Sequence, residues 1–223
     1  RFARARWRAD APCLAAAGLT PERLAALADR AGRLRAAADA AVAQRLAAAI
    51  SLYPEGYATA DRPLLLAPPD EIAIRALARC LATLGGGSYP PAGPALVRLL
   101  VRLRQGGAAG HTLAGCLLLE RGGKRPHLLI CREPGRVTTR LPAAGAETVL
   151  WDGRFRVHLP ASAGASAAAD PPEIARLGPE GRRWLIDPAA PAPALESLPG
   201  LWQGAHLLAV PEFASRQTSM TSV

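Results

Sequence analysis

An amphipathic pattern runs through residues 18–50, "GLTPERLAALADRAGRLRAAADAAVAQRLAAAI", and commits this part of the chain to a helix. Thr20 is a favourable N-cap, Pro21 suits the first helical position, and Glu22 interacts well with the helix dipole. Apolar side chains then recur every three or four residues, which is typical of a helix with one apolar stripe. The stripe consists of Leu24, Leu27, Ala31, Leu34, Ala38, Val42 and Leu46. The sequence therefore predicts a long helix that ends before Pro54.

Further helical patterns lie on both sides of this segment. Residues 70–87, "DEIAIRALARCLATLGGG", and residues 94–107, "PALVRLLVRLRQGG", predict two helices that end at glycines. Residues 1–18 predict a short helix interrupted near Pro12, and residues 56–69 leave room for a short strand pair. Only 4% of the residues are aromatic, so Ala and Leu supply most of the apolar content, which favours helix. We expect residues 1–106 to form an all-helical module.

The pattern changes after residue 106. Residues 111–133, "HTLAGCLLLERGGKRPHLLICRE", predict two strands joined by a Gly-Gly turn, and "ETVLWDGRFRVHLP" predicts a second hairpin with its turn at "WDG". One or two short helices and further strands follow, and residues 215–223 predict a frayed tail. We therefore expect an α+β protein with a small, mostly antiparallel β-rich module over residues 107–214.

The cysteines and the hydropathy pattern restrict the location of the protein. Cys13, Cys80, Cys116 and Cys131 are widely spaced, which indicates small buried side chains and fits a reducing cytoplasm. The chain has no apolar run long enough to cross a bilayer, and no apolar core of a signal peptide follows its basic start. We expect a cytoplasmic protein without a membrane partner.

The sequence contains no recognisable catalytic constellation. It has no phosphate loop, no G-x-G-x-x-G after a strand, no H-E-x-x-H and no G-x-S-x-G elbow. Its histidines lie far apart, at His111, His127, His158 and His206. We therefore predict no catalytic residue, no metal site and no cofactor site within this chain.

The remaining functional signal in the sequence is its clustered arginines. The net charge is +9 with a single lysine, which suggests a polyanionic partner, although a GC-rich genome would also raise the arginine content. The opening "RFARARWR" combines guanidinium groups that grip phosphate with an indole that can stack on a base. "CREPGR" adds arginines beside a predicted turn. The candidate RNA-binding residues are Arg1, Arg4, Arg6, Trp7, Arg8, Arg132 and Arg136. A solvated or salt-bridging role for the opening segment remains the alternative.

Several segments, taken in order, resemble the tRNA(Ile)-lysidine synthetases. "RFARARWRADAPCLAAAGLTPERLA" is similar to the stretch that closes the catalytic domain of that family and begins its helical region. "DEIAIRALARCLATLGGGSYPP", "TLAGCLLLE", "LLICREPGRV", "WDGRFRV" and "LPGLW" resemble successive later blocks. The resemblance rests on the order of these blocks and spans nearly the whole chain.

The resemblance implies a ligase that joins free lysine to the wobble cytidine of isoleucine tRNA. In that family ATP, with Mg²⁺, first adenylates the base in an N-terminal domain that carries "S-G-G-x-D-S". This sequence has no such motif, so no ATP-binding residue of the family can be assigned here. The expected role is the tRNA-recognition part, with residues 1–18 as an Arg-rich junction to a missing catalytic domain. A homodimer stays open, and a stand-alone RNA-binding or protein-interaction module derived from the family is the alternative.

Overall fold

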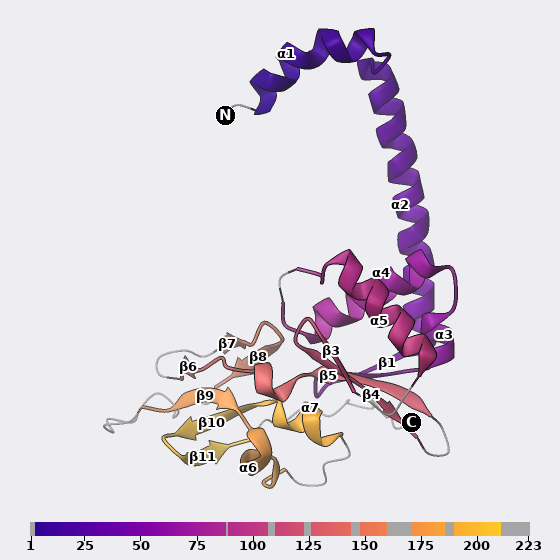
Figure 1. Cartoon of the computed structure of the whole chain (residues 1–223). Coiled ribbons are helices and arrows are strands. Elements are labelled where there is room, and N and C mark those ends of the chain that lie inside the picture. Colours follow the sequence, from indigo (N-terminus) through magenta and orange to yellow (C-terminus); the bar gives the residue numbers. More distant parts are fainter. Residues whose placement is uncertain are drawn as a thin grey trace, which may run out of the picture. The chain divides into compact units, whose positions relative to one another are not determined.

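A computed structural model gives the arrangement of most of the chain (Figure 1). It describes residues 3–87, 89–106, 110–122, 126–143, 148–159, 171–185 and 190–210. The predicted tail at 215–223 and most of the predicted Gly-Gly turn lie outside these residues. The chain divides into two compact units, Arg1–Gln44 and Arg45–Val223.

The first unit is helical. Helix α1 spans Ala3–Ala16 and helix α2 spans Pro21–Ala49, so α2 begins at the predicted N-cap. The amide of Arg23 donates to Thr20 Oγ1 at 3.4 Å. Between the helices, Gly18 has a φ of +81° and the amide of Leu19 donates to the Leu14 carbonyl at 2.8 Å, which closes α1 in a Schellman motif. The expected interruption near Pro12 is wrong, because α1 continues through that residue.

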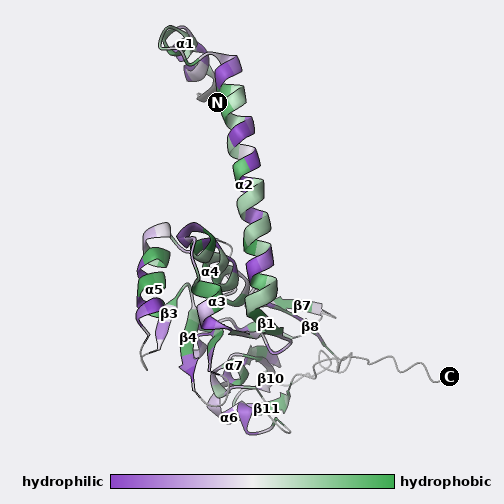
Figure 2. Cartoon of the chain, turned by 90° about the vertical axis from the view of Figure 1, so that its right-hand side faces the viewer, coloured by the Kyte–Doolittle hydropathy of each residue, from purple (hydrophilic) through white to green (hydrophobic). Residues whose placement is uncertain are grey.

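The apolar stripe of α2 is only partly buried. Figure 2 shows hydrophobic and hydrophilic residues alternating along this helix. Val42 is fully buried, whereas the side chains of Leu27 and Leu34 are 62% and 64% exposed. The pattern therefore predicted the helix correctly, but the first half of its apolar face is open.

The second unit contains a five-stranded antiparallel sheet in the order β1-β2-β5-β4-β3. Its strands are β1 (Ile50–Tyr53), β2 (Tyr57–Ala60), β3 (His111–Leu113), β4 (Cys116–Arg121) and β5 (His127–Arg132). Strand β5 is buried on both faces, which explains its unbroken apolar run. Leu129 and Cys131 pack with Ala194 of helix α7 (Ala192–Glu196), so Leu128 and Ile130 lie on the opposite face.

Three helices of this unit supply much of its core. They are α3 (Arg62–Leu66), α4 (Asp70–Leu84) and α5 (Gly93–Gln105), and Figure 1 shows α4 and α5 together on one side of the sheet. The buried face of α4 includes Leu77 and Leu81, as its periodicity predicted. Helices α4 and α5 therefore match the two helices expected after the long one.

The remaining strands form two smaller antiparallel sheets. One has the order β11-β10-β9-β6, and the other is the hairpin β7-β8. The strands are β6 (Leu141–Pro142), β7 (Thr148–Trp151), β8 (Phe155–His158), β9 (Glu173–Arg176), β10 (Pro199–Gln203) and β11 (His206–Ala209). Short helices η1 (Pro134–Arg136) and α6 (Gly178–Arg182) complete this part. Asp152 and Gly153 have positive φ at the predicted "WDG" turn, which confirms it.

The α+β fold class is confirmed, with helices followed by antiparallel sheets. Of the short strand pair expected within residues 56–69, only β2 lies there, whereas β1 occupies residues 50–53, which the sequence predicted as the end of the long helix. Strand β2 pairs with β5 from Tyr57 opposite Cys131 to Ala60 opposite Leu128. One sheet thus contains residues from both sides of position 106, and the proposed division into 1–106 and 107–214 stays a prediction from sequence.

Candidate nucleic-acid interface

The Arg-rich opening lies on helix α1. Arg6 and Arg8 are exposed, and the side chain of Trp7 is 63% exposed. Arg1 lies outside the described residues, and Arg4 lies in α1 with a side chain that the structure does not describe. Arg6 and Arg8 lie two positions apart on the helix, so they offer cationic groups in more than one direction.

One face of α1 borders a shallow depression of about 530 Å³. Arg6, Trp7, Asp10, Cys13 and Leu14 line it. A guanidinium beside an indole can hold a phosphate next to a stacked base, but the carboxylate of Asp10 opposes an anion at the same face. Cys13 is exposed, so its expected burial is wrong, because no other described element covers this side of α1.

The structure gives Arg132 an internal role. Its Nε donates to Asp152 Oδ2 and its Nη2 to Asp152 Oδ1, both at 3.0 Å, and the side chain is only 11% exposed. Its Nη1 donates to the Gly115 carbonyl at 3.0 Å. This geometry favours a structural ion pair over the RNA contact expected from sequence.

A second buried arginine shares the same carboxylate. Arg154 Nε donates to Asp152 Oδ2 at 2.8 Å and Nη2 donates to the Ser197 carbonyl at 2.7 Å. Its guanidinium lies 4.8 Å from the ring centre of Phe155, and burial lowers the pKa of Arg154 against the opposing effect of Asp152. The Arg132–Asp152–Arg154 cluster therefore connects the β7-β8 turn to β5 and to the end of α7.

Arg136 is the member of the "CREPGR" pair that solvent reaches. Its side chain is 74% exposed on η1, and its Nε lies 3.9 Å from Glu133 Oε2. Exposed pairs of this kind contribute little energy, so the guanidinium can exchange its partner for a phosphate. The RNA-binding role of Arg136 stays a prediction from sequence.

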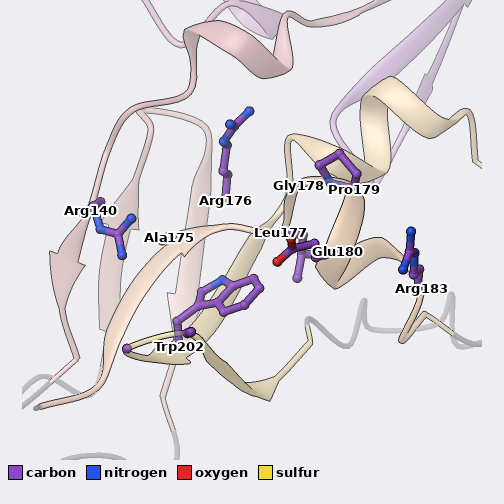
Figure 3. A pocket seen from close by; sticks show the side chains of 11 residues that line it. Arg140, Ala175, Arg176, Leu177, Gly178, Pro179, Glu180, Arg183 and Trp202 are labelled. Carbon is purple, nitrogen blue, oxygen red and sulfur yellow. The ribbon is translucent and has the colours of Figure 1, made fainter.

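A larger depression was missed from sequence. It encloses about 550 Å³ beside β9, β10 and α6, and Figure 3 shows the indole of Trp202 between Arg140 and Arg183. Arg176 and Glu180 also line it. These side chains come from separate segments and share no spacing motif, and the antiparallel pairing of β9 with both β10 and β6 brings several of them together.

The described glycine run does not suit a phosphate, and the described residues contain no metal-binding cluster. The glycine run 85–87 follows helix α4 rather than a strand, and a Cβ on Gly86 would lie 2.2 Å from the Asp152 carbonyl oxygen. These glycines therefore serve packing against the hairpin turn rather than a phosphate cradle. No group of three or more His, Cys, Asp or Glu side chains within the described ranges could hold a metal ion.

The buried thiols are also unsuited to catalysis. Burial raises the pKa of Cys80 to about 11 and the pKa values of Cys116 and Cys131 to about 12. All three are protonated at neutral pH and behave as the small buried side chains that the sequence predicted. In the part of the chain that the structure describes, no helix is long and apolar enough to cross a membrane.

Comparison with known proteins decides the relationship. Over 221 residues, the chain is 33% identical to a tRNA(Ile)-lysidine synthase of Ruegeria pomeroyi, a match that covers 95% of this chain and 47% of the relative. The chain is a homologue of the tRNA(Ile)-lysidine synthases. Synthases of that name from a Methylobacterium species and from Methylobacterium nodulans are 42% and 41% identical over 147 and 146 residues. The resemblance inferred from block order is thereby confirmed.

The chain spans less than half the length of these tRNA(Ile)-lysidine synthases, namely 47%, 42% and 41%. The two Methylobacterium matches cover 63% and 61% of this chain. No protein-family model and no solved structure gives a significant match.

Proposed function

We propose that this chain is the tRNA-recognition part of a tRNA(Ile)-lysidine synthase, the ATP-dependent ligase that attaches lysine to the wobble cytidine of isoleucine tRNA. The observation that carries the proposal is its 33% identity, over 221 residues, to the Ruegeria pomeroyi synthase. On this proposal ATP with Mg²⁺ and free lysine bind to an N-terminal domain, and this chain alone does not ligate. The proposal includes a cytoplasmic location and leaves homodimerisation open.

The exposed arginines support such a role. Arg6, Arg8 and Arg136 present guanidinium groups to solvent from helices of different parts of the chain. An enzyme that modifies one anticodon base must recognise its tRNA by contacts far from that base, and such contacts are mostly to phosphates and to shape. A surface of arginines without reactive groups suits this task. Arg132 is left out of the proposed contacts because Asp152 occupies its guanidinium.

Binding and ligation assays together test the proposal. The 223-residue chain should bind isoleucine tRNA in a filter-binding assay more tightly than a tRNA of equal length with another identity. The chain alone should form no lysidine from lysine and ATP, whereas the full-length gene product should form it. Lysidine formation by the isolated chain, or the absence of any tRNA binding, would contradict the proposal.

The alternative is a stand-alone RNA-binding or protein-interaction module derived from the synthases. It is favoured by the same lack of an ATP site among the described residues. This module would bind isoleucine tRNA and other tRNAs equally well, because non-selective binding follows from phosphate contacts alone. The tRNA comparison above therefore separates the two functions.

A further inference from the structure

We propose that the depression around Trp202 binds one unpaired nucleotide of an RNA, with the base on the indole face and the phosphate among Arg140, Arg176 and Arg183. The inference rests on the proposed function, since it takes RNA as the partner of the chain. It adds a specific site in the second unit.

One edge of the indole ring packs against two glycines. A Cβ on Gly200 would lie 3.0 Å from Trp202 Nε1, and a Cβ on Gly181 would lie 3.3 Å from Cζ2 of the same ring. The ring thus packs closely over positions without side chains, and its Nε1 is buried with no hydrogen-bond partner among the described residues. The glycines cover the Nε1 edge of a half-buried ring that lines the depression, so a base would stack on an indole face rather than bond to the N–H.

The arginines around the ring retain unused donors. Arg140 contacts Glu173 through Nε and Nη2, and Arg176 uses Nη1 to donate to the Pro134 carbonyl at 2.8 Å. Arg183 is exposed and forms no ion pair with a carboxylate among the described residues. Each guanidinium carries five N–H donors, so all three can still donate to a phosphate oxygen.

The charge of the site favours an anion only modestly. Glu173 neutralises Arg140, and the hydrogen bond from Arg140 lowers the pKa of Glu173, so this carboxylate stays ionised at neutral pH. Glu180 also lies on the lining. Three arginines against two carboxylates leave one positive charge, which matches a single phosphodiester rather than a duplex backbone.

The dimensions also favour one nucleotide. A cavity of about 550 Å³ falls within the range of sites for small ligands. In a base-paired stem both faces of each base are covered by its neighbours, so an indole can stack only on an unpaired base or on one at a stem end. An RNA nucleotide and a free mononucleotide share this chemistry, and we assign the site to RNA because the proposed partner is tRNA.

Fluorescence anisotropy with a labelled single-stranded RNA hexamer tests the site in the complete 223-residue chain. Loss of one base–aromatic stack should weaken hexamer binding about tenfold in Trp202→Leu, while Trp202→Phe should retain most of the affinity. Arg183→Ala should lower the salt slope by about 0.7, the value for one phosphate contact with a single strand. Arg183 is exposed, so this variant tests the site without the risk that a half-buried residue is needed for folding.

Matched controls lie elsewhere in the same unit. Trp184 is 72% exposed and does not line the depression, and Arg98 is exposed on α5, so Trp184→Leu and Arg98→Ala should leave hexamer binding unchanged. Equal effects of test and control variants would overturn the site, as would wild-type binding by Trp202→Leu and Arg183→Ala. AMP that binds as tightly as the hexamer would overturn the assignment to RNA.

A parallel titration with isoleucine tRNA separates the two proposals. Binding of tRNA without binding of the hexamer would overturn the Trp202 site and leave the proposed function standing. Absence of binding to both would overturn the proposed function together with the site.

Discussion

Replacing Asp152 with Asn would remove the only carboxylate between two buried guanidinium groups in the described cluster. Asp152 accepts three hydrogen bonds, two from Arg132 and one from Arg154. Its side chain is 6% exposed, and those of the two arginines are 11% and 3% exposed. Asn preserves the shape and tolerates the φ of +49° at this turn, so the substitution isolates the loss of charge.

The magnitude follows from burial. Loss of one partner from a buried ion pair costs about 3–5 kcal/mol, because the remaining charge is left without compensation. Hydrogen bonds to charged groups contribute about 1.5–3 kcal/mol each, so the sum over the three bonds would exceed this range. The sum does not apply, because the energies of bonds to one carboxylate are not additive. We expect Asp152→Asn to lower the free energy of unfolding by about 3–5 kcal/mol, which corresponds to a Tm loss of roughly 6–20 °C for a unit of this size.

Urea unfolding followed by far-ultraviolet circular dichroism would measure this loss. The matched control is Glu71→Gln, which breaks the exposed pair of Glu71 with Arg75 on α4 and should cost no more than about 0.5 kcal/mol. A loss below about 1 kcal/mol for Asp152→Asn, comparable to the control, would refute the view that this cluster holds the second unit together.

Three further predictions concern pH, a helix end and RNA. Because burial raises the pKa values of Cys116 and Cys131 from 9 to about 12, the folded state keeps protons that the unfolded chain releases. The contribution of these thiols to the free energy of unfolding should therefore be fully present below pH 9 and be lost as pH rises toward 12. The urea midpoint of Cys131→Ala should fall less steeply over this range than that of the wild type. Thr20→Ala should destabilise the first turn of α2 by about 1 kcal/mol, because the Arg23 amide loses its acceptor. Hydrogen exchange at the Arg23 amide would measure this loss, and an unchanged exchange rate would exclude the cap. Alanine at Arg4, Arg6 and Arg8 should weaken tRNA binding and reduce its salt slope by roughly one unit per lost phosphate contact, whereas an unchanged slope would make the segment structural.

The helices and hairpins were largely predictable from sequence, because each carries its own apolar periodicity or turn motif. The three-to-four spacing from Leu24 to Leu46 marked α2, and "WDG" marked a hairpin turn that requires positive φ. Exposure was harder to predict, because a stripe such as Leu27 and Leu34 shows what a helix can bury and not whether another element covers it. Pro12 shows a further limit, since a residue unfavourable in a helix is tolerated inside α1.

The candidate site was less predictable, because side-chain partners come from distant segments. Arg132 looked like an RNA contact beside a turn, and only the fold brings Asp152 to its guanidinium. The depression around Trp202 depends on the pairing of β9 with β10 and β6 and on two glycines at one edge of the ring. The spacing of residues in the sequence does not reveal such contacts. The opening with Trp7 is exposed, and its RNA-binding role stays a prediction that rests on the sequence alone.

The pairing of β2 with β5 determines where this protein can be cut. A fragment that starts at residue 107 would lose β1 and β2, and the backbone of β5 between Leu128 and Cys131 would become an open sheet edge. Open apolar edges recruit strands from other molecules, so such a fragment should aggregate on expression. A fragment that starts at residue 45 keeps all five strands and the helices α3–α5 on the sheet, and it is the better choice for crystallisation or NMR.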